Sequence, residues 1–248
     1  MKTDAAPVLI LCELPETEMA GIETFSPFCL KVRHALAVSE LTFTSRRASD
    51  PGSFRKLGGT GQVPILLIGE EVVADSTAIL TRIAELAPGV LDVGLDARGR
   101  AESRLWEELA DTALNGFLVA ARWADGRNWP GVRDAYFRGA PWFVPALIAP
   151  RVRAKVVRGL EARDVWRAGH DACWDRFGAT LDDLDARAPE AGFWLGSSLS
   201  RADIALFGQL HALRTPLTPW QKDQVAARKR LDAYLDRVGA APGERARS

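Results

Sequence analysis

The first 90 residues alternate between strand-like and helix-like segments. Four short segments have the apolar runs or the alternation that are typical of β-strands: PVLILCEL (7–14), LTFTSRR (41–47), VPILLI (63–68) and EEVVA (70–74). Apolar residues at helical spacing predict helices that begin at Pro27 and at Ser76, with a shorter helix at 50–57 between them. The predicted order is therefore β-α-β-α-β-β-α, an α/β sandwich.

The remaining residues show almost no strand pattern. Apolar stripes and helix-boundary residues predict helices at 99–125, 151–168, 170–187, 200–213 and 219–238. The stretch GVLDVGLDARG separates the two patterns. We therefore expect an α/β domain at 1–88, a linker at 89–98 and an all-helical domain at 99–248.

The charge and the rare residue types argue against several classes of function. Lys+Arg and Asp+Glu number 32 each, and only 226–230 and 244–248 are locally basic, so we expect no nucleic-acid partner. Three cysteines and three histidines are scattered without metal-ligand spacing, so we expect no metal. The apolar stretch at 141–150 is too short to span a bilayer, and the expected location is cytoplasmic.

Ser26-Pro27-Phe28-Cys29 stands at the start of the first predicted helix. Serine is a favoured N-cap and proline a favoured first helical residue, so capping alone accounts for Ser26 and Pro27. The same geometry presents a hydroxyl and the positive end of the helix to a bound anion such as a thiolate. Ser26 is therefore a candidate for both roles.

Two further stretches have both a structural and a functional interpretation. Pro64 cannot donate to a sheet ladder, so it either simply starts a strand or forms a cis bond that leaves the Val63 backbone free for an extended peptide ligand. Asp75 and Ser76 precede a helix, which they either cap or use to bind an α-amino acid head group. In the second case Ser76 and the first free N–H groups would hold the carboxylate, and Asp75 the ammonium group.

These three stretches and the order of elements resemble the thioredoxin-like N-terminal domain of the glutathione transferase superfamily. In the second domain, Ser200 and Asp203 form a predicted capping box, flanked by Leu199 and Ile204 as a hydrophobic staple. This is similar to the capping motif of the superfamily's central helix. The SPFC start and the ADIALFGQL helix look most like a bacterial branch near the metaxin-like and failed-axon-connection-like members.

The resemblance implies a glutathione site on the first domain, with glutathione as cosubstrate and no metal. The implied residues are Ser26 facing the sulfur, Val63 before Pro64 at the cysteinyl backbone, Asp75 and Ser76 at the γ-glutamyl group, and Lys56 or Gln62 at the glycyl carboxylate. A small hydrophobic electrophile would lie between the domains, with the candidate wall residues Trp106, Asn115, Arg122, Trp123 and Tyr136. The implied activity is transfer of the glutathione thiol to that electrophile, and a homodimer is the superfamily default.

Two features leave other functions open. The segment Pro15–Phe25 separates the first strand from Ser26, where it either forms a flap or displaces Ser26, and it favours a non-catalytic protein that uses the fold for binding. Cys29, if exposed, would instead form a mixed disulfide with glutathione and support a thiol-dependent reductase or peroxidase. His34 is expected on an exposed face of the first helix.

Overall fold

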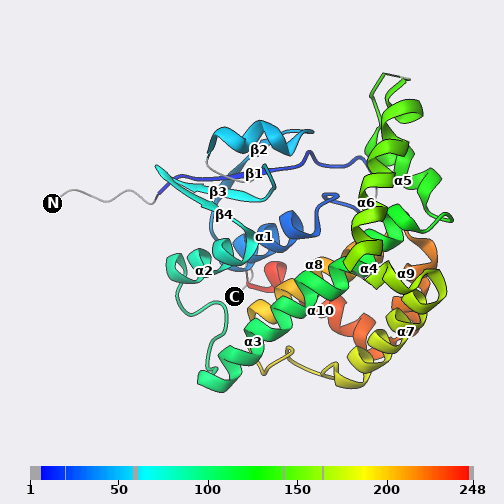
Figure 1. Cartoon of the computed structure of the whole chain (residues 1–248). Coiled ribbons are helices and arrows are strands. Elements are labelled where there is room, and N and C mark those ends of the chain that lie inside the picture. The colour runs from blue at the N-terminus through cyan, green and yellow to red at the C-terminus, as the bar shows by residue number, and fades with distance from the viewer. Residues whose placement is uncertain (1–6, 20, 58–60, 142, 164, 246–248) are drawn as a thin grey trace.

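The computed structural model describes residues 7–19, 21–57, 61–141, 143–163 and 165–245 (Figure 1). The stretch GGTGQ (58–62), which the sequence indicates to be a loop between the short helix and the third strand, lies partly outside these residues. Four strands form one mixed sheet, as predicted: β1 (Leu9–Glu13), β2 (Phe43–Arg47), β3 (Ile65–Ile68) and β4 (Glu71–Ala74). In the order β2-β1-β3-β4, β1 runs parallel to β2, and β3 runs antiparallel to both of its neighbours.

Helices cover both faces of this sheet and complete a thioredoxin-like domain (Figure 1). The helices of this domain are α1 (Pro27–Val38), α2 (Ser76–Leu86) and the 3₁₀ helix η1 (Pro51–Leu57). Because side chains alternate along a strand, the residues of β1 pack into two separate hydrophobic clusters, one on each face of the sheet. Leu9 and Leu11 belong to the main core with α1 and α2, whereas Cys12 packs with Phe54 of η1 in a separate cluster.

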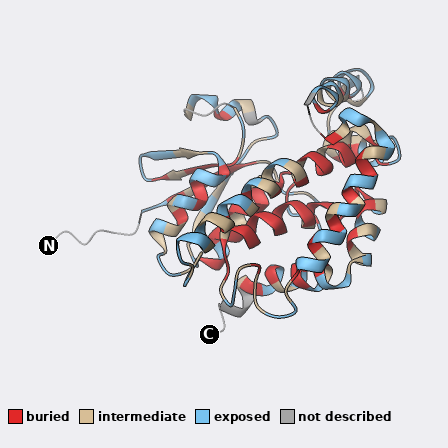
Figure 2. Ribbon diagram, turned by 60° about the horizontal axis from the view of Figure 1, so that its bottom comes forward, coloured by how far each residue is buried: buried red, intermediate tan, exposed pale blue. Residues whose placement is uncertain are grey.

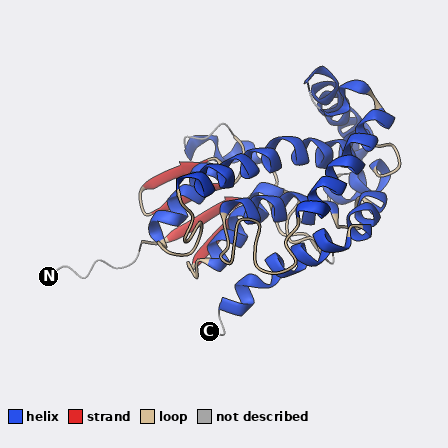
Figure 3. Ribbon diagram, turned by 90° about the horizontal axis from the view of Figure 1, so that it is seen from below, coloured by secondary structure: helices blue, strands red, loops and turns tan. Residues whose placement is uncertain are grey.

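The rest of the described chain is helical, and Figure 3 shows the strands gathered at one side of the molecule. Its elements are α3 (Ala97–Leu109), η2 (Ala110–Leu114), α4 (Asn115–Val119), η3 (Ala120–Ala124), α5 (Trp129–Tyr136), η4 (Val144–Ile148), α6 (Ala149–Arg163), η5 (Val165–Ala168), α7 (His170–Arg187), α8 (Arg201–Leu213), α9 (Pro219–Ala227) and α10 (Lys229–Arg245). The helix predicted at 99–125 is one run interrupted by two π-helical turns, η2 and η3. The sequence patterns did not predict α5 or η4.

The central helix is α8, in which eleven of thirteen residues are buried; Figure 2 shows buried turns running through the middle of the molecule. Ser200 Oγ accepts a hydrogen bond from the Asp203 N–H, and Asp203 Oδ2 accepts one from the Ser200 N–H at 2.8 Å. This confirms the predicted capping box. Asp203 Oδ1 also accepts from the Trp194 N–H at 2.7 Å and from the Tyr234 hydroxyl at 2.6 Å. Asp203 therefore joins α8 to α10 and to the preceding loop.

A close approach of two helices fixes the first turn of α1. A Cβ atom on Gly208 of α8 would lie 3.0 Å from the carbonyl oxygen of Pro27, closer than nearly all real Cβ contacts. Only glycine lets α8 come this near without a shift of the backbone. The buried core continues from the sheet through α1 to α8, so the start of α1 is held from both sides.

Candidate functional site

Four segments of the chain meet at one end of the sheet, where β1, β2 and β4 end and β3 begins. β1 ends at Glu13 and β2 at Arg47, and these two residues are paired in register. At the same edge β3 begins with Ile65, which lies opposite Cys12 of β1 and Ala74 at the end of β4. The segments that follow β1, β2 and β4 therefore meet the segment that precedes β3.

Ser26 is the N-cap of α1. Its Oγ accepts a hydrogen bond from the Cys29 N–H at 3.2 Å, and its backbone is extended. The side chain is nearly covered, since Ser26 is 9% exposed. The first turn of the helix leaves backbone N–H groups at its positive end. The capping role of Ser26 is confirmed, and its role toward a thiolate stays a prediction.

A cavity of about 560 Å³, which we call the Pro64 cavity, lies beside the first turn of α1. Its lining includes Phe28, Gln62, Val63, Pro64, Ala74, Asp75, Ser76, Thr77, Glu108 and Asp111. The Val63–Pro64 bond is cis, one of the two forms expected for Pro64, and binding of an extended peptide ligand beside it stays a prediction. The ladder of β3 begins at Ile65, so the backbone of Val63 lies outside it.

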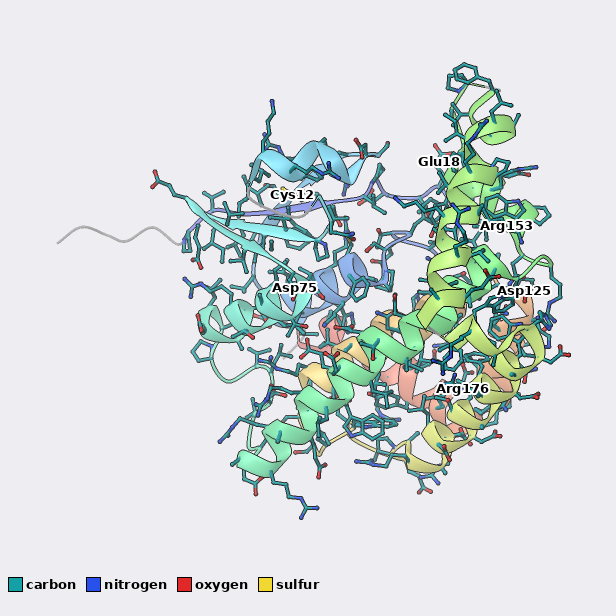
Figure 4. The ribbon with its side chains drawn as sticks, in the orientation of Figure 1. Cys12, Glu18, Asp75, Asp125, Arg153 and Arg176 are labelled. Atoms are coloured by element: carbon teal, nitrogen blue, oxygen red, sulfur yellow. The ribbon has the colours of Figure 1, made fainter. Side chains whose placement is uncertain are left out.

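Asp75 caps α2 with its own carboxylate. Its Oδ1 accepts hydrogen bonds from the Thr77 N–H at 2.9 Å and the Ala78 N–H at 3.2 Å. Its φ of +83° lies in the left-handed region that non-glycine residues rarely adopt. Figure 4 shows Asp75 where β4 meets α2. The prediction that the first N–H groups of this helix are free for a ligand is therefore wrong for Thr77 and Ala78, whereas Ser76 lines the cavity.

Lys31 is a buried cation that links α1 to Ser76 and to the helical domain. Its Nζ lies 2.7 Å from Glu107 Oε1, contacts Asp111 Oδ2 and lies 3.5 Å from Ser76 Oγ. The Lys31 side chain is 1% exposed. Burial raises the pKa of Asp111, and the ammonium of Lys31 opposes that rise. Asp111 stands in the π-helical turn η2, a type of turn that is frequent at functional sites.

A second cavity of about 420 Å³, which we call the Tyr136 cavity, lies between α5 and the segment after β1. Its lining includes Leu14, Pro15, Glu16, Met19, Phe25, Ser49, Tyr136 and Arg138. The ring of Tyr136 stacks on Phe25 with the centroids 4.3 Å apart. The Tyr136 hydroxyl accepts a hydrogen bond from Arg122 Nη1 at 3.0 Å, and the same nitrogen donates to the Phe25 carbonyl at 2.6 Å. Arg122 is 2% exposed.

The segment Pro15–Phe25, which we call the strap, folds back on itself as far as it is described. A bridge pairs Glu16 with Thr24, and the Thr17 N–H donates to the Glu23 carbonyl at 3.3 Å. Apolar residues of the strap pack on α5 and the loop before α9 in one small cluster: Met19, Ile22 and Phe25 with Trp129, Val132, Ala135, Tyr136 and Leu217. The strap therefore leaves Ser26 as the N-cap of α1, and its role as a flap stays a prediction.

Ser26 stands between the two cavities. Phe25, which precedes it, lines the Tyr136 cavity, and Phe28, two residues after it, lines the Pro64 cavity. Figure 4 shows Glu18 on the part of the strap that reaches toward α5 and α6, away from Asp75. A group bound over the first turn of α1 therefore has a cavity on either side.

Two family models match this arrangement of domains. The model described as glutathione S-transferase N-terminal domain matches residues 27–128, and the model described as glutathione S-transferase, C-terminal domain matches residues 166–237. The chain belongs to the glutathione S-transferase superfamily. The first match runs past residue 88 and through the linker predicted at 89–98.

Solved structures share the superfamily fold over nearly the whole chain. The β-etherase LigF from Sphingobium sp. strain SYK-6 is 22% identical, with a TM-score of 0.66 over 96% of this chain and 98% of that one. Glutathione transferase GSTFuA3 from Phanerochaete chrysosporium is 14% identical, with a TM-score of 0.66 over the same shares, 96% and 98%. A glutathione transferase homologue from sulfitobacter, solved with bound glutathione, is 17% identical, with a TM-score of 0.55 over 94% and 93%. At these identities the likeness establishes the fold.

The structure brings most of the glutathione residues implied by the superfamily together. Five of them share the Pro64 cavity: Gln62, Val63, Pro64, Asp75 and Ser76. Lys56 is not among the residues that line this cavity, and it is exposed. The reason is that η1, which carries Lys56, packs on the face of the sheet opposite to α1.

The predicted electrophile wall needs correction. Of its five residues, Tyr136 alone lines one of the cavities described above. The other four pack elsewhere: Trp106 on Trp194, Asn115 on Gln209, Trp123 behind the ring of Tyr136, and Arg122 beneath its hydroxyl. Trp123 and Arg122 therefore support the Tyr136 side chain, whereas Trp106 and Asn115 pack away from it.

Burial removes the condition for a redox role of Cys29 and corrects the placement of His34. Cys29 is 0% exposed, and burial raises the pKa of its thiol to about 11. A reactive cysteine needs access and a lowered pKa, so the exposed Cys29 that the reductase alternative requires is not found. His34 is not on an exposed face, because α8 and α10 cover it: its Nε2 lies 2.9 Å from the Val238 carbonyl oxygen. Burial lowers the pKa of His34 to about 4.

Sequence reasoning missed several residues that shape this site. Glu108 and Asp111 bring charge to the Pro64 cavity from the helical domain, and Lys31 contacts Asp111 and Ser76 of its lining. The only sequence signal was a lysine among apolar positions of α1. Within the described ranges, no group of His, Cys, Asp and Glu side chains is placed to hold a metal ion. None of the described helices is long and apolar enough to cross a membrane.

Proposed function

We propose that this chain is a glutathione transferase that binds glutathione in the Pro64 cavity and a small hydrophobic electrophile in the Tyr136 cavity. The observation that carries the proposal is the position of Ser26 at the positive end of α1, between the two cavities. A thiolate held there by the hydroxyl and the helix end reaches substrates on the other side of α1.

The Pro64 cavity has groups that suit each part of glutathione. The Val63 backbone lies outside the β3 ladder and is available to the cysteinyl unit. The Ser76 amide and hydroxyl suit the γ-glutamyl carboxylate, and the carboxylates of Glu108 and Asp111 suit the ammonium group beside it. Gln62 is placed for the glycyl carboxylate, a role for which Lys56 is poorly placed. The volume of about 560 Å³ falls in the range of small-molecule sites.

The first chemical step is ionisation of the glutathione thiol. A free thiol titrates near pH 8.5, so only a few per cent is thiolate at neutral pH. A hydrogen bond from the Ser26 hydroxyl and the partial charge of the helix end both favour the anion, and each pKa unit is worth about 1.4 kcal/mol. Ser26 keeps its own proton, and the thiol proton passes to solvent. The sulfur then forms a bond to the electrophile, whose leaving group or oxygen takes the electron pair.

Tyr136 suits the electrophile for two reasons. Its ring and that of Phe25 give the cavity an aromatic wall for an apolar substrate. Its hydroxyl accepts from Arg122, which has no lone pair to accept in return, so the phenolic proton points to another acceptor. That proton is available to an oxygen on which negative charge develops.

Calorimetric titration and a conjugation assay test this proposal. We expect glutathione to bind, Ser76→Ala to weaken binding about tenfold, and the exposed-serine control Ser53→Ala to leave it unchanged. Ser26→Ala should lower the rate of conjugation to an aryl halide without abolishing glutathione binding. Absence of glutathione binding by the wild-type protein contradicts the proposal.

A binding protein without transferase activity is the second candidate. The observation in its favour is the low exposure of Ser26, which is not among the residues that line either cavity. Glutathione binding together with no conjugation of any electrophile, in the wild type and in Ser26→Ala alike, would identify this second function.

A further inference from the structure

The turn between α5 and α6 exposes a group of large apolar side chains. Phe143 is 44% exposed, Leu147 is 55% exposed and Ile148 is 43% exposed. All three lie within six residues of sequence, whereas the other exposed large apolar residues of the described chain are scattered over distant elements. Figure 1 shows this turn projecting from the body of the molecule at the end of α6. A clustered, projecting apolar group is typical of an interaction site.

A row of cations continues from this apolar group along α6. Arg151, Lys155 and Arg158 are all exposed, and their spacing of four and three residues places them on one face of the helix. Residues 129–163 contain seven lysines and arginines against two acidic residues, a net charge of +5. Because the whole chain has a net charge of zero, the remainder carries −5. The stretch RVRAK (151–155) has three cations in five residues, as many as AARKR at 226–230, so the expectation that only 226–230 and 244–248 are locally basic is wrong.

We propose that this surface, the α6 tip (Phe143, Leu147, Ile148, Arg151, Lys155 and Arg158), docks on the surface of an anionic lipid bilayer. Apolar side chains enter the boundary between headgroups and acyl chains, and lysine and arginine pair with the lipid phosphates. A nucleic acid would engage the cations and leave the apolar group in water. The bilayer surface is the partner whose chemistry matches both halves of the α6 tip.

The α6 tip is close in sequence to the wall of the Tyr136 cavity. Arg138 and Gly139 line that cavity, and Phe143 follows four residues later in the same turn. Docking would therefore bring a wall of the electrophile cavity to the membrane surface, where apolar electrophiles accumulate. This consequence rests on the proposed function, but the docking itself does not.

Flotation of the full-length protein with lipid vesicles tests the proposal. The vesicles are phosphatidylcholine alone or phosphatidylcholine with phosphatidylglycerol, at low and at high salt. We expect binding to the anionic vesicles at low salt, weak binding at high salt and little binding to phosphatidylcholine alone. Each cation near an anionic bilayer strengthens binding roughly fivefold. The triple change Arg151→Gln, Lys155→Gln, Arg158→Gln should therefore weaken the partition roughly a hundredfold.

Matched control variants distinguish an effect of the α6 tip from a general effect of charge or of exposed apolar side chains. Lys56→Gln, Arg98→Gln and Lys222→Gln together remove the same charge from exposed positions elsewhere, and should change binding little. Leu147→Ser should weaken binding, whereas Leu105→Ser, at a residue that is 69% exposed on α3, should not. Circular dichroism checks that each variant is folded.

Three results would overturn the proposal. These are no binding of the folded wild type to anionic vesicles, equal binding to both kinds of vesicle, and an equal loss in the tip variants and their controls. A further outcome also contradicts it: if vesicles are not bound but the protein is a dimer that Leu147→Ser dissociates, the α6 tip is a contact between copies of the chain. Loss of glutathione binding or of conjugation has no bearing on these results, so failure of the two proposals can be distinguished.

Discussion

Replacing Lys31 by methionine tests how the two domains are joined beside the Pro64 cavity. The change keeps an unbranched side chain and removes the charge that lies 2.7 Å from Glu107 Oε1 and contacts Asp111. The side chain of Glu107 is 3% exposed, so its carboxylate cannot be hydrated in place of the lost ammonium. Removing one partner of a buried ion pair costs about 3–5 kcal/mol. Arg201 Nη1, 3.6 Å from Glu107 Oε2, keeps the expected loss at the lower end, about 3 kcal/mol.

The loss of stability in Lys31→Met should increase as the pH rises. Burial raises the pKa of Asp111 above the ordinary value of 3.8, and Lys31 opposes the rise, so Lys31→Met raises it further. Below pH 3.8 Asp111 is protonated in both folded and unfolded chains, and its charge then plays no part in the cost. As the pH rises, Asp111 ionises first in the unfolded chain, because its pKa is lower there. This difference lowers the free energy of unfolding of the folded variant. The loss of stability in Lys31→Met should therefore be smaller at pH 4.5 than at pH 8.

Urea unfolding followed by circular dichroism measures this loss. The control is Lys56→Met, which removes an exposed lysine and should cost less than about 0.5 kcal/mol. Adding Glu107→Gln and Asp111→Asn to Lys31→Met should restore part of the stability, because no unpaired buried charge is then left. A loss no larger than that of the control, or a triple variant no more stable than Lys31→Met, would refute this account of the interface.

Three other predictions follow from single side chains. Tyr136→Phe should lower turnover about tenfold to a hundredfold for electrophiles with an oxygen acceptor, such as enones or epoxides, and leave alkyl halides unaffected in steady-state assays. At pH 8, Cys29 should resist a disulfide-exchange reagent until the protein is unfolded, because its site is closed and about one thiol in a thousand is ionised; rapid native labelling would contradict this. Asp203→Asn should lower the free energy of unfolding in urea by about 2–3 kcal/mol, because the amide nitrogen of asparagine would replace an oxygen that accepts hydrogen bonds, at either Oδ position. A loss below about 1 kcal/mol would contradict this.

Local patterns were sufficient to predict the thioredoxin-like domain. Its strands are short apolar runs bounded by turn residues, and its helices begin at Ser-Pro and Asp-Ser, which are strong start signals. The capping box at Ser200 was predictable for the same reason, since both of its residues lie within one turn. The π-helical turns were not predictable, because the buried positions keep the ordinary helical spacing of three and four residues through them.

Contacts between distant residues account for what the sequence could not predict. Lys31 meets Glu107 and Asp111, which follow it by 76 and 80 residues on another domain. His34 was placed on the wrong face because its neighbours on α1 do not reveal that α10, some 200 residues later, covers it. Likewise, four of the five residues predicted for the electrophile wall lie on the run from α3 to η3, whereas the fifth, Tyr136, lines a cavity together with Phe25, a residue distant in sequence.

The strap connects Ser26 to the wall of the Tyr136 cavity. Its apolar cluster with α5 is small and separate from the main core, so it can open at a lower cost than α1 itself. Glu16 ties it to the sheet domain through Arg33 and Arg47, two contacts at the surface that contribute little against such an opening. The same strap supplies half of the wall of the Tyr136 cavity. Because the strap leads directly into Ser26 and lines the Tyr136 cavity, we expect a change in the strap to alter the position of Ser26 and the shape of that cavity together, while the residues around Pro64 and Ser76 stay in place.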